Sequence, residues 1–504
     1  MNFKSLLEIA VLAIIVFIAP NIYAQGDWAQ IGLDIDGEAA GDRSGGAVSI
    51  SANGNFVAIG AELNDGAGAD AGHVRVYENI ADTWIQLGGD INGESAGDLF
   101  GSSVSISDDG LTVAVGAEKN AGAGVDAGHV RVYQLVGAIW TQIGGDIDGE
   151  AAGDLSGVSV SLNVDGTIVA IGADKNDGSG IDAGHARIYE YTGGVWTQVG
   201  GDIDGELAYD WSGSSVSIND SGTIVAIGAT RNDGAGGSAG HVRIYENIGG
   251  VWIQVGADID GEAVSDQSGK SVSLNGDGTF VAIGAPKNDG AGADAGHTRV
   301  YENVGGAWVQ VGGDLDGLVA GDEVGWSVSL NSTGEIVAFG APKSSDGSAE
   351  AGHVRVFENI AGVWTQIGSN VVGEALYDRS GWAVGINADG TIFADGAYVN
   401  DGTGTSAGHT RVYRLYCDSL VVTASTTELC LGDNLILDAT SVNGGAITWD
   451  GGVVNGVPFV TDIPGVITYT AISTDGVDCE FSIDIIVNDL PTVTASVDDP
   501  EICL

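Results

Sequence analysis

A set of four acidic residues recurs in the chain at relative positions 1, 3, 5 and 9, around a glycine at position 4. Alternate oxygen ligands around a glycine turn are what a hard cation such as Ca²⁺ requires. The complete sets are Asp34, Asp36, Glu38 and Asp42; Asp146, Asp148, Glu150 and Asp154; Asp202, Asp204, Glu206 and Asp210; and Asp258, Asp260, Glu262 and Asp266. One interpretation is therefore a series of weak calcium sites.

The other copies of the set are incomplete. Asn92 replaces an aspartate, Leu318 replaces the glutamate, and Asn370 and Val372 replace the first two acids. The glycine also lies earlier than in a helix–loop–helix calcium loop. The alternative, which these departures favour, is an acidic connecting loop that uses aspartate and glycine for turn geometry. We expect no required cofactor, with calcium as the candidate ion.

Histidine is the second residue type that could do chemistry. A ring of imidazoles could bind a transition metal, but each histidine follows Ala-Gly at the start of an expected strand, once per repeat. If the repeats close into a ring, equivalent positions are spread around it and do not meet at one site. We therefore interpret these histidines as packing or hydrogen-bonding residues. The chain's histidines are His73, His129, His185, His241, His297, His353 and His409, each 56 residues after the last.

The elements that position these residues follow from a second series with the same step. Trp28, Trp84, Trp140, Trp196, Trp252, Trp308 and Trp364 are also 56 residues apart. In one repeat, strands are predicted at 159–162, 167–173, 185–189 and 195–199, separated by glycine-rich turns and without helical periodicity. Four antiparallel strands in about 50 residues are typical of a propeller blade.

The phase of the two series predicts closure of a ring. A tryptophan strand precedes the first histidine, whereas no tryptophan strand follows His409. The strand around Trp28 is therefore expected to pair beside 409–413 and to complete the last blade, which removes exposed sheet edges. The predicted fold is all-β, with a seven-bladed propeller of four-stranded blades at 25–416.

The repeat resembles the FG-GAP family, whose relatives include the seven-bladed propeller of integrin α chains. Phe100-Gly101 matches one half of the signature, and Gly284-Ala285-Pro286 and Gly340-Ala341-Pro342 match the other. The family's calcium loop between these halves is reduced here to turns such as Asp109-Gly110. The resemblance therefore implies the fold, but not calcium at the family's positions.

The two ends of the chain differ from the repeat. Residues 1–24, with an apolar run from 6 to 19, are predicted to be a cleaved secretory signal peptide. Residues 417–490 resemble an Ig-like β-sandwich of bacterial surface proteins, and 491–504 resemble the start of a second, truncated module. Because exported chains keep disulfides, we expect Cys430 to bridge to Cys479, whereas Cys417 and Cys503 have no evident partner.

Charge excludes several partners. The chain has 17 basic and 69 acidic residues, a net charge of −52. Nucleic acid requires a basic face, so it is not an expected partner. Anionic membranes are disfavoured for the same reason, and no direct membrane insertion is expected once the signal peptide is removed.

We therefore expect a secreted or cell-surface bacterial protein that binds an extracellular protein or glycan and is not an enzyme. Its histidines all belong to the repeat, and no unique nucleophile adjoins a unique base. Aromatic residues that break the repeat could stack on a ligand or fill the core. A polysaccharide lyase or glycosidase, or a structural surface-layer element, are the alternatives. These aromatic residues are Tyr209, Trp211, Trp326, Tyr377 and Trp382.

Overall fold

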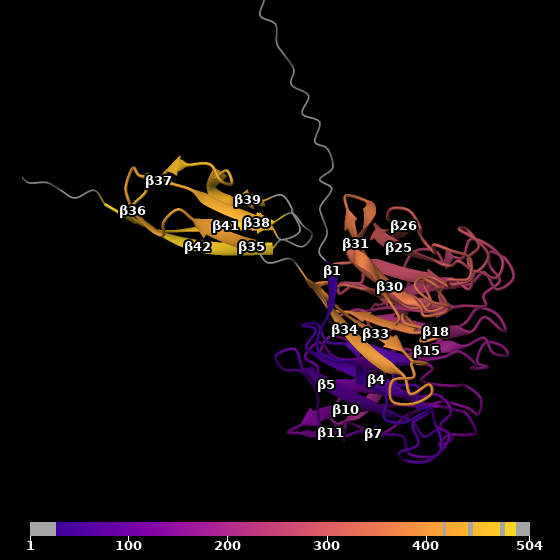
Figure 1. Cartoon of the computed structure of the whole chain (residues 1–504). Coiled ribbons are helices and arrows are strands. Elements are labelled where there is room, and N and C mark those ends of the chain that lie inside the picture. Colours follow the sequence, from indigo (N-terminus) through magenta and orange to yellow (C-terminus); the bar gives the residue numbers. More distant parts are fainter. Residues whose placement is uncertain (1–26, 417–419, 442–446, 474–478, 490–504) are drawn as a thin grey trace, which may run out of the picture. The chain divides into compact units, whose positions relative to one another are not determined.

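The computed structural model describes residues 27–416, 420–441, 447–473 and 479–489. The predicted signal peptide and the predicted truncated module at 491–504 lie outside the described residues. Asp27–Tyr416 forms one compact unit, and the described residues from 420 onward belong to a second. The described residues contain many strands and no α-helix, so the all-β prediction is confirmed (Figure 1).

Residues 27–416 form six five-stranded sheets and one four-stranded sheet, each built on four antiparallel strands. These four strands are consecutive in sequence in every sheet but the last, whose fourth strand is β1. The first strands are β3 (Ala47–Ile50), β8 (Phe100–Ile106), β13 (Ser159–Leu162), β18 (Ser212–Ile218), β23 (Ser271–Leu274), β28 (Val328–Leu330) and β32 (Ala383–Ile386). The second strands are β4 (Phe56–Ala61), β9 (Thr112–Ala117), β14 (Ile168–Ala173), β19 (Ile224–Ala229), β24 (Phe280–Ala285), β29 (Ile336–Ala341) and β33 (Ile392–Ala397). These second strands are apolar and buried on both faces, as their unbroken runs of alanine, valine and isoleucine predict.

The histidines begin the third strands, and most of the repeated tryptophans lie on the fourth. The third strands are β5 (His73–Asn79), β10 (His129–Val136), β15 (His185–Thr192), β20 (His241–Asn247), β25 (His297–Val304), β30 (His353–Ile360) and β34 (His409–Tyr416). The fourth are β6 (Trp84–Gln86), β11 (Ile139–Gln142), β16 (Val195–Gln198), β21 (Trp252–Gln254), β26 (Ala307–Gln310), β31 (Val363–Val372) and β1 (Asp27–Gln30). Short strands of the acidic loops also pair with the third strands: β2 (Ile35–Asp36), β7 (Ile91–Asn92), β12 (Ile147–Asp148), β17 (Ile203–Asp204), β22 (Ile259–Asp260) and β27 (Leu315–Asp316).

The sheets follow one another in a closed ring. Each first strand contacts the first strand of the next sheet, and β32 contacts β3. A cycle of backbone hydrogen bonds joins the turns after these strands. Each amide in the cycle donates to the carbonyl oxygen of the residue 56 positions later, and the amide of the last residue donates to the carbonyl oxygen of the first. The cycle runs through Ala52, Asp108, Val164, Asp220, Gly276, Ser332 and Ala388, at 3.0–3.3 Å.

The N-terminal strand closes the seventh sheet. β1 pairs with β34, with Trp28 opposite Leu415 and Gln30 opposite Tyr413. The predicted pairing of the first strand beside the last histidine strand is therefore present. Because β34 would otherwise leave its outer edge unpaired, this strand also protects the sheet from edge-to-edge association.

The glycines of the FG-GAP signature explain how closely the sheets approach. Gly172, in the Gly-Ala half, lies against Gly213 of the next sheet, and a Cβ on Gly172 would lie 2.0 Å from the carbonyl oxygen of Gly213. Gly213 itself has a φ of +87°, which disfavours any side chain. The two halves of the signature thus act in neighbouring sheets, where only glycine fits.

The second unit has its own β-sheets and core. Its strands are β35 (Leu420–Ala424), β36 (Glu428–Cys430), β37 (Asn434–Leu435), β38 (Leu437–Ser441), β39 (Ile447–Trp449), β40 (Phe459–Val460), β41 (Gly465–Ser473) and β42 (Cys479–Asn488). Leu435, Leu437, Trp449 and Ile485 are among its buried core residues. The sheets are β36-β42-β41-β39, β35-β38 and β37-β40.

The predicted bridge between Cys430 and Cys479 is not formed. β36 pairs with the end of β42, where Cys430 lies opposite Asn488, whereas Cys479 begins that strand. The register therefore places Cys430 beside the last residue of β42, whereas Cys479 is the first residue of that strand. The length of the strand separates them by more than a disulfide can span. Cys430 is a partly buried free thiol.

Candidate functional site

Two groups of polar residues gather at the same end of the ring, where first strands begin, second strands end and third strands begin. One group repeats around the ring and contains the histidines. The other lies beside the starts of the first strands and breaks the repeat. The repeated group includes residues of the predicted acidic sets.

Each repeated cluster joins one histidine to carboxylates from two loops. Nδ1 of His297 lies 3.8 Å from Oε2 of Glu262 and 3.9 Å from Oδ2 of Asp314. Glu262 belongs to the acidic loop before the histidine and Asp314 to the loop after it. The imidazole is only 1% exposed, whereas both carboxylates reach solvent.

The cluster recurs at four other histidines. Four further groups of this kind place a histidine nitrogen and two carboxylate oxygens within 4.8 Å of one another: Glu38, His73 and Asp90; Glu94, His129 and Asp146; Glu150, His185 and Asp202; and Glu206, His241 and Asp258. Asp34, Asp36 and His409 form a related group. At His353, Leu318 and Asn370 occupy the two acid positions, so that histidine lacks both carboxylates.

The histidines are held in the neutral form. Burial, followed by the charge of the arginine two residues on, lowers the pKa of His185, His241 and His297 to about 4. The neighbouring carboxylates oppose this shift but do not reverse it. A neutral imidazole has a nitrogen lone pair available at neutral pH, which is the form that binds metals.

The arginines of the third strands secure the same loops. Arg299 Nη2 donates to the carbonyl oxygen of Asp260 at 2.8 Å, and Nη1 lies 3.5 Å from Oε1 of Glu262. The guanidinium thus fixes the loop backbone and one oxygen of the glutamate.

The structure divides each predicted acidic set among different partners. Asp258 lies 3.9 Å from His241, whereas Glu262 belongs to the His297 cluster. The backbone of Asp260 pairs with His241 in β22. The fourth acid, Asp266, is buried and accepts hydrogen bonds from the Ala263 amide at 2.9 Å and from Asn288 Nδ2 at 2.9 Å.

In the other three complete sets the fourth acid is likewise set apart from the rest. Asp42, Asp154 and Asp210 are buried like Asp266, and each binds the asparagine 22 residues later. The four acids of a loop therefore do not face a single ion. Calcium binding by these loops stays a prediction, and the fourth acid has a structural role.

The second group is a set of charged residues that occurs once around the ring. Glu118 and Asp174 follow the second strands of two neighbouring sheets, and Lys270 immediately precedes β23. Burial raises the pKa of Glu118 to about 7, with Glu62 and Asp174 adding to the shift and Lys270 opposing it. Burial likewise raises the pKa of Asp174 to about 6.

Lys270 is influenced by acids from three other sheets. Burial lowers the pKa of its ammonium group, whereas Asp174, Glu118 and Glu323 raise it. Residues on sheets that are not neighbours can approach in this way only near the axis of the ring. We call Glu118, Asp174, Lys270 and Glu323 the axial charged cluster.

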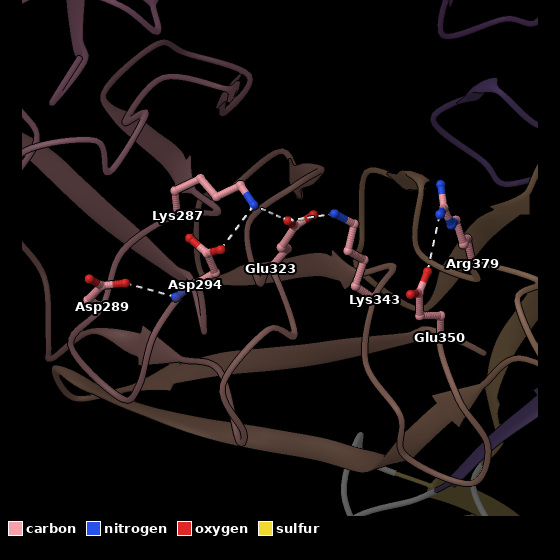
Figure 2. A network of polar contacts seen from close by, with 7 residues as sticks. All are labelled: Lys287, Asp289, Asp294, Glu323, Lys343, Glu350 and Arg379. Carbon is pink, nitrogen blue, oxygen red and sulfur yellow. Dashed lines mark hydrogen bonds and ion pairs between the residues drawn. The ribbon is translucent and has the colours of Figure 1, made fainter.

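Glu323 anchors a wider network on this face (Figure 2). Its side chain is 2% exposed and pairs with Lys287 and, at 2.9 Å, with Lys343. Lys287 also approaches Asp294 at 3.4 Å. Arg379 pairs with Glu350 nearby at 3.1 Å.

Aromatic residues adjoin the axial charged cluster. The ring centroid of Trp382 lies 4.5 Å from that of Trp326 and 4.2 Å from that of Tyr398. Lys270 Nζ lies over the indole ring of Trp326, 4.7 Å from the ring centroid. We call Trp326, Trp382 and Tyr398 the aromatic wall.

The other aromatic residues that break the repeat are placed differently. Trp211 lies between Lys175 and Arg231, 2.9 and 3.4 Å from its ring centroid. Tyr209 and Tyr377 are exposed residues of the acidic loops. Neither tyrosine joins the aromatic wall.

Sequence reasoning missed the charged cluster and the histidine clusters. The signal for the charged cluster is that the residue after each Gly-Ala varies, from Glu118 and Asp174 to Pro286 and Tyr398, within an otherwise constant repeat. The signal for the histidine clusters is the constant spacing of a glutamate 35 residues before and an aspartate 17 residues after most histidines.

Comparison with known proteins identifies one repeat of the chain. The FG-GAP repeat model matches residues 92–133, which include the Phe100-Gly101 signature. No curated protein matches the chain. Among the described residues, no helix is long and apolar enough to cross a bilayer.

Two solved structures are similar to the chain. A putative 6-phosphogluconolactonase from Bacteroides uniformis is 12% identical, with a TM-score of 0.48 over 68% of this chain and 89% of that one. A periplasmic gluconolactonase from Pseudomonas aeruginosa is 13% identical, with a TM-score of 0.44 over 65% of this chain and 86% of that one.

These comparisons correct one expectation. Both similar structures are named as lactonases, so the prediction that this chain is not an enzyme was wrong as a deduction from its fold. At this level of identity they assign no activity to the chain.

Proposed function

We propose that the chain is an exported, seven-bladed propeller protein whose axial face binds a carbohydrate. The single observation that carries the proposal is the aromatic wall beside the axial charged cluster. In this wall the ring centroid of Trp382 lies 4.5 Å from that of Trp326 and 4.2 Å from that of Tyr398. Flat aromatic rings stack on the apolar faces of sugars, and charged groups beside them hydrogen-bond the hydroxyl groups.

Asymmetry supports this face as the ligand site. The tryptophans at 28, 84, 140, 196, 252, 308 and 364 serve the ring equally, because each donates its indole hydrogen to a neighbouring sheet. Trp326 and Trp382 instead share one repeat position, which holds other residue types in the remaining five repeats: Gly46, Ser102, Val158, Ser214 and Lys270. A single ligand requires a local departure from the repeat, and this pair of tryptophans in neighbouring repeats provides one.

An array of glycans tests the proposal directly. We expect the full chain to bind one class of polysaccharide, and we expect Trp382→Ala to weaken that binding at least tenfold. Tyr377→Ala, which changes an exposed aromatic residue outside the wall, is the matched control. Equal binding by both variants, or binding of an extracellular protein at another surface, would contradict the proposal.

A second candidate is a polysaccharide-acting enzyme at the same face. The pKa of Glu118 near 7 and that of Asp174 near 6 favour it, since carboxyl groups with such values can donate and accept protons near neutral pH. Release of new sugar ends from the bound polysaccharide, lost in Glu118→Gln but not in Glu335→Gln, would establish this candidate. Binding without turnover would leave the carbohydrate-binding function alone.

A further inference from the structure

The His297 cluster places a buried imidazole without a hydrogen-bond partner beside two carboxylates. As at His353, which lacks the two carboxylates, Nδ1 and Nε2 of His297 are buried and have no hydrogen-bond partner. A buried imidazole in a purely structural role normally forms at least one hydrogen bond. Here Nδ1 instead points between two carboxylates at 3.8 and 3.9 Å, which is too long for a hydrogen bond.

The ligand types select the ion. An imidazole nitrogen with two carboxylate oxygens suits Zn²⁺, whereas Ca²⁺ takes six to eight oxygen ligands. Three protein ligands at about 2.0–2.2 Å leave the fourth position of a tetrahedral zinc site to water. Because such ligand atoms are about 3.3 Å apart, each carboxylate oxygen must move toward the histidine nitrogen from 3.8 and 3.9 Å, and both carboxylates are exposed enough to do so.

Neighbouring side chains already orient the two carboxylates. Oδ1 of Asp314 accepts a hydrogen bond from Gln310 Nε2 at 2.7 Å, which leaves Oδ2 directed to the histidine. Arg299 holds Oε1 of Glu262, which leaves Oε2 directed to the same nitrogen. Groups of this kind fix metal ligands in proteins.

We propose that His297, Glu262 and Asp314 bind Zn²⁺, and that the equivalent clusters at His73, His129, His185 and His241 do the same. The His409 group, with two aspartates, is a related site. His353 is excluded, because Leu318 and Asn370 replace its carboxylates. This inference is independent of carbohydrate binding.

The chain supplies its own control for the test. His297 and His353 begin equivalent strands and are buried to the same extent, but only His297 has both acids. We would measure zinc bound per chain by equilibrium dialysis in excess calcium, for the unaltered protein, His297→Gln and His353→Gln. We expect His297→Gln to lose one equivalent of tightly bound zinc and His353→Gln to lose none.

A spectroscopic probe separates specific sites from the acidic surface. Co²⁺ bound with imidazole in a site of low coordination number gives a strong visible ligand-field absorption, whereas Co²⁺ on surface carboxylates does not. The double variant Glu262→Gln, Asp314→Asn keeps the buried histidine and should reduce this absorption if His297→Gln fails to fold. Displacement of the bound zinc by calcium would overturn the proposal. An equal loss of bound zinc in the His297 and His353 variants would overturn it as well.

Discussion

The indole nitrogen of Trp28 donates a hydrogen bond of 2.9 Å to the carbonyl oxygen of Ile367, across 339 positions of the chain. The other repeated tryptophans make the same bond to a residue 53 positions earlier, as Trp84 does to Ile31. Trp28 therefore makes the equivalent bond around the closure of the ring. Its ring also packs edge-on against Phe393 at 4.7 Å.

Closure should contribute measurably to stability. We expect Trp28→Ala to lower the free energy of unfolding by about 3 kcal/mol, because it removes a buried aromatic ring from the last sheet. Trp28→Phe, which keeps an apolar ring but not the hydrogen bond, should cost about 1 kcal/mol. Urea unfolding followed by circular dichroism measures both changes. An unaltered midpoint in Trp28→Ala would show that the N-terminal strand does not close the ring.

The buried fourth acid of each loop should stabilise the fold whether or not calcium is present. Asp154 accepts hydrogen bonds from the Ala151 amide and from Asn176, so Asp154→Ala removes a buried acceptor that holds both donors. We expect a loss of about 3 kcal/mol, equal with calcium and with a chelator. Asp154→Asn keeps an acceptor oxygen and should cost less. A loss that appears only with calcium present would contradict this structural role.

Two carboxylates of the network in Figure 2 should differ in how much they contribute to the free energy of unfolding. Glu323 is buried and binds two lysines, so Glu323→Gln should lower the free energy of unfolding by about 2 kcal/mol. Glu350 binds Arg379 in a more exposed pair, and Glu350→Gln should change it by at most about 0.5 kcal/mol. Thermal unfolding of the two variants side by side measures the difference. Equal effects would be inconsistent with the burial of Glu323.

Glu118 should make stability depend on pH. Its pKa rises from 4.5 to about 7 on folding, so between these values the folded state binds more protons than the unfolded state. The free energy of unfolding therefore falls as pH rises through this window. Glu118→Gln should remove about 2 kcal/mol of that fall, seen as a gap between variant and unaltered protein that widens from pH 4 to pH 8.

The control for this titration is Glu335→Gln, which changes an exposed glutamate of a turn. Its stability should stay parallel to that of the unaltered protein across the same range. If Glu118→Gln also stays parallel, Glu118 is ionised in the folded state at pH 6 and the account of its burial is wrong.

The sequence predicted the elements well because the repeat is long and regular. The strands at 159–162 and 185–192 and the pairing of the first strand with the last follow from the phase of the tryptophan and histidine series. Such local patterns and closure depend on spacing alone.

The sites could not be predicted in the same way. Glu118, Asp174 and Lys270 lie more than 50 residues apart in sequence, and only the ring brings their charges together. The acids of one loop looked like one site because they are adjacent in sequence. The structure instead turns Asp258 toward His241 and Glu262 toward His297, on different sheets.

The central claim is that the axial aromatic wall contacts the ligand. Hydroxyl-radical footprinting of the full chain, with and without the polysaccharide that the array identifies, tests it most directly. We predict that the polysaccharide protects the partly exposed Trp326 and Trp382 from oxidation and leaves Tyr209 and Tyr377 unchanged, whereas Tyr398 is buried in the free protein and does not report on binding. Protection of the two exposed tyrosines with the wall still oxidised, or an array that yields no carbohydrate ligand, would contradict the claim.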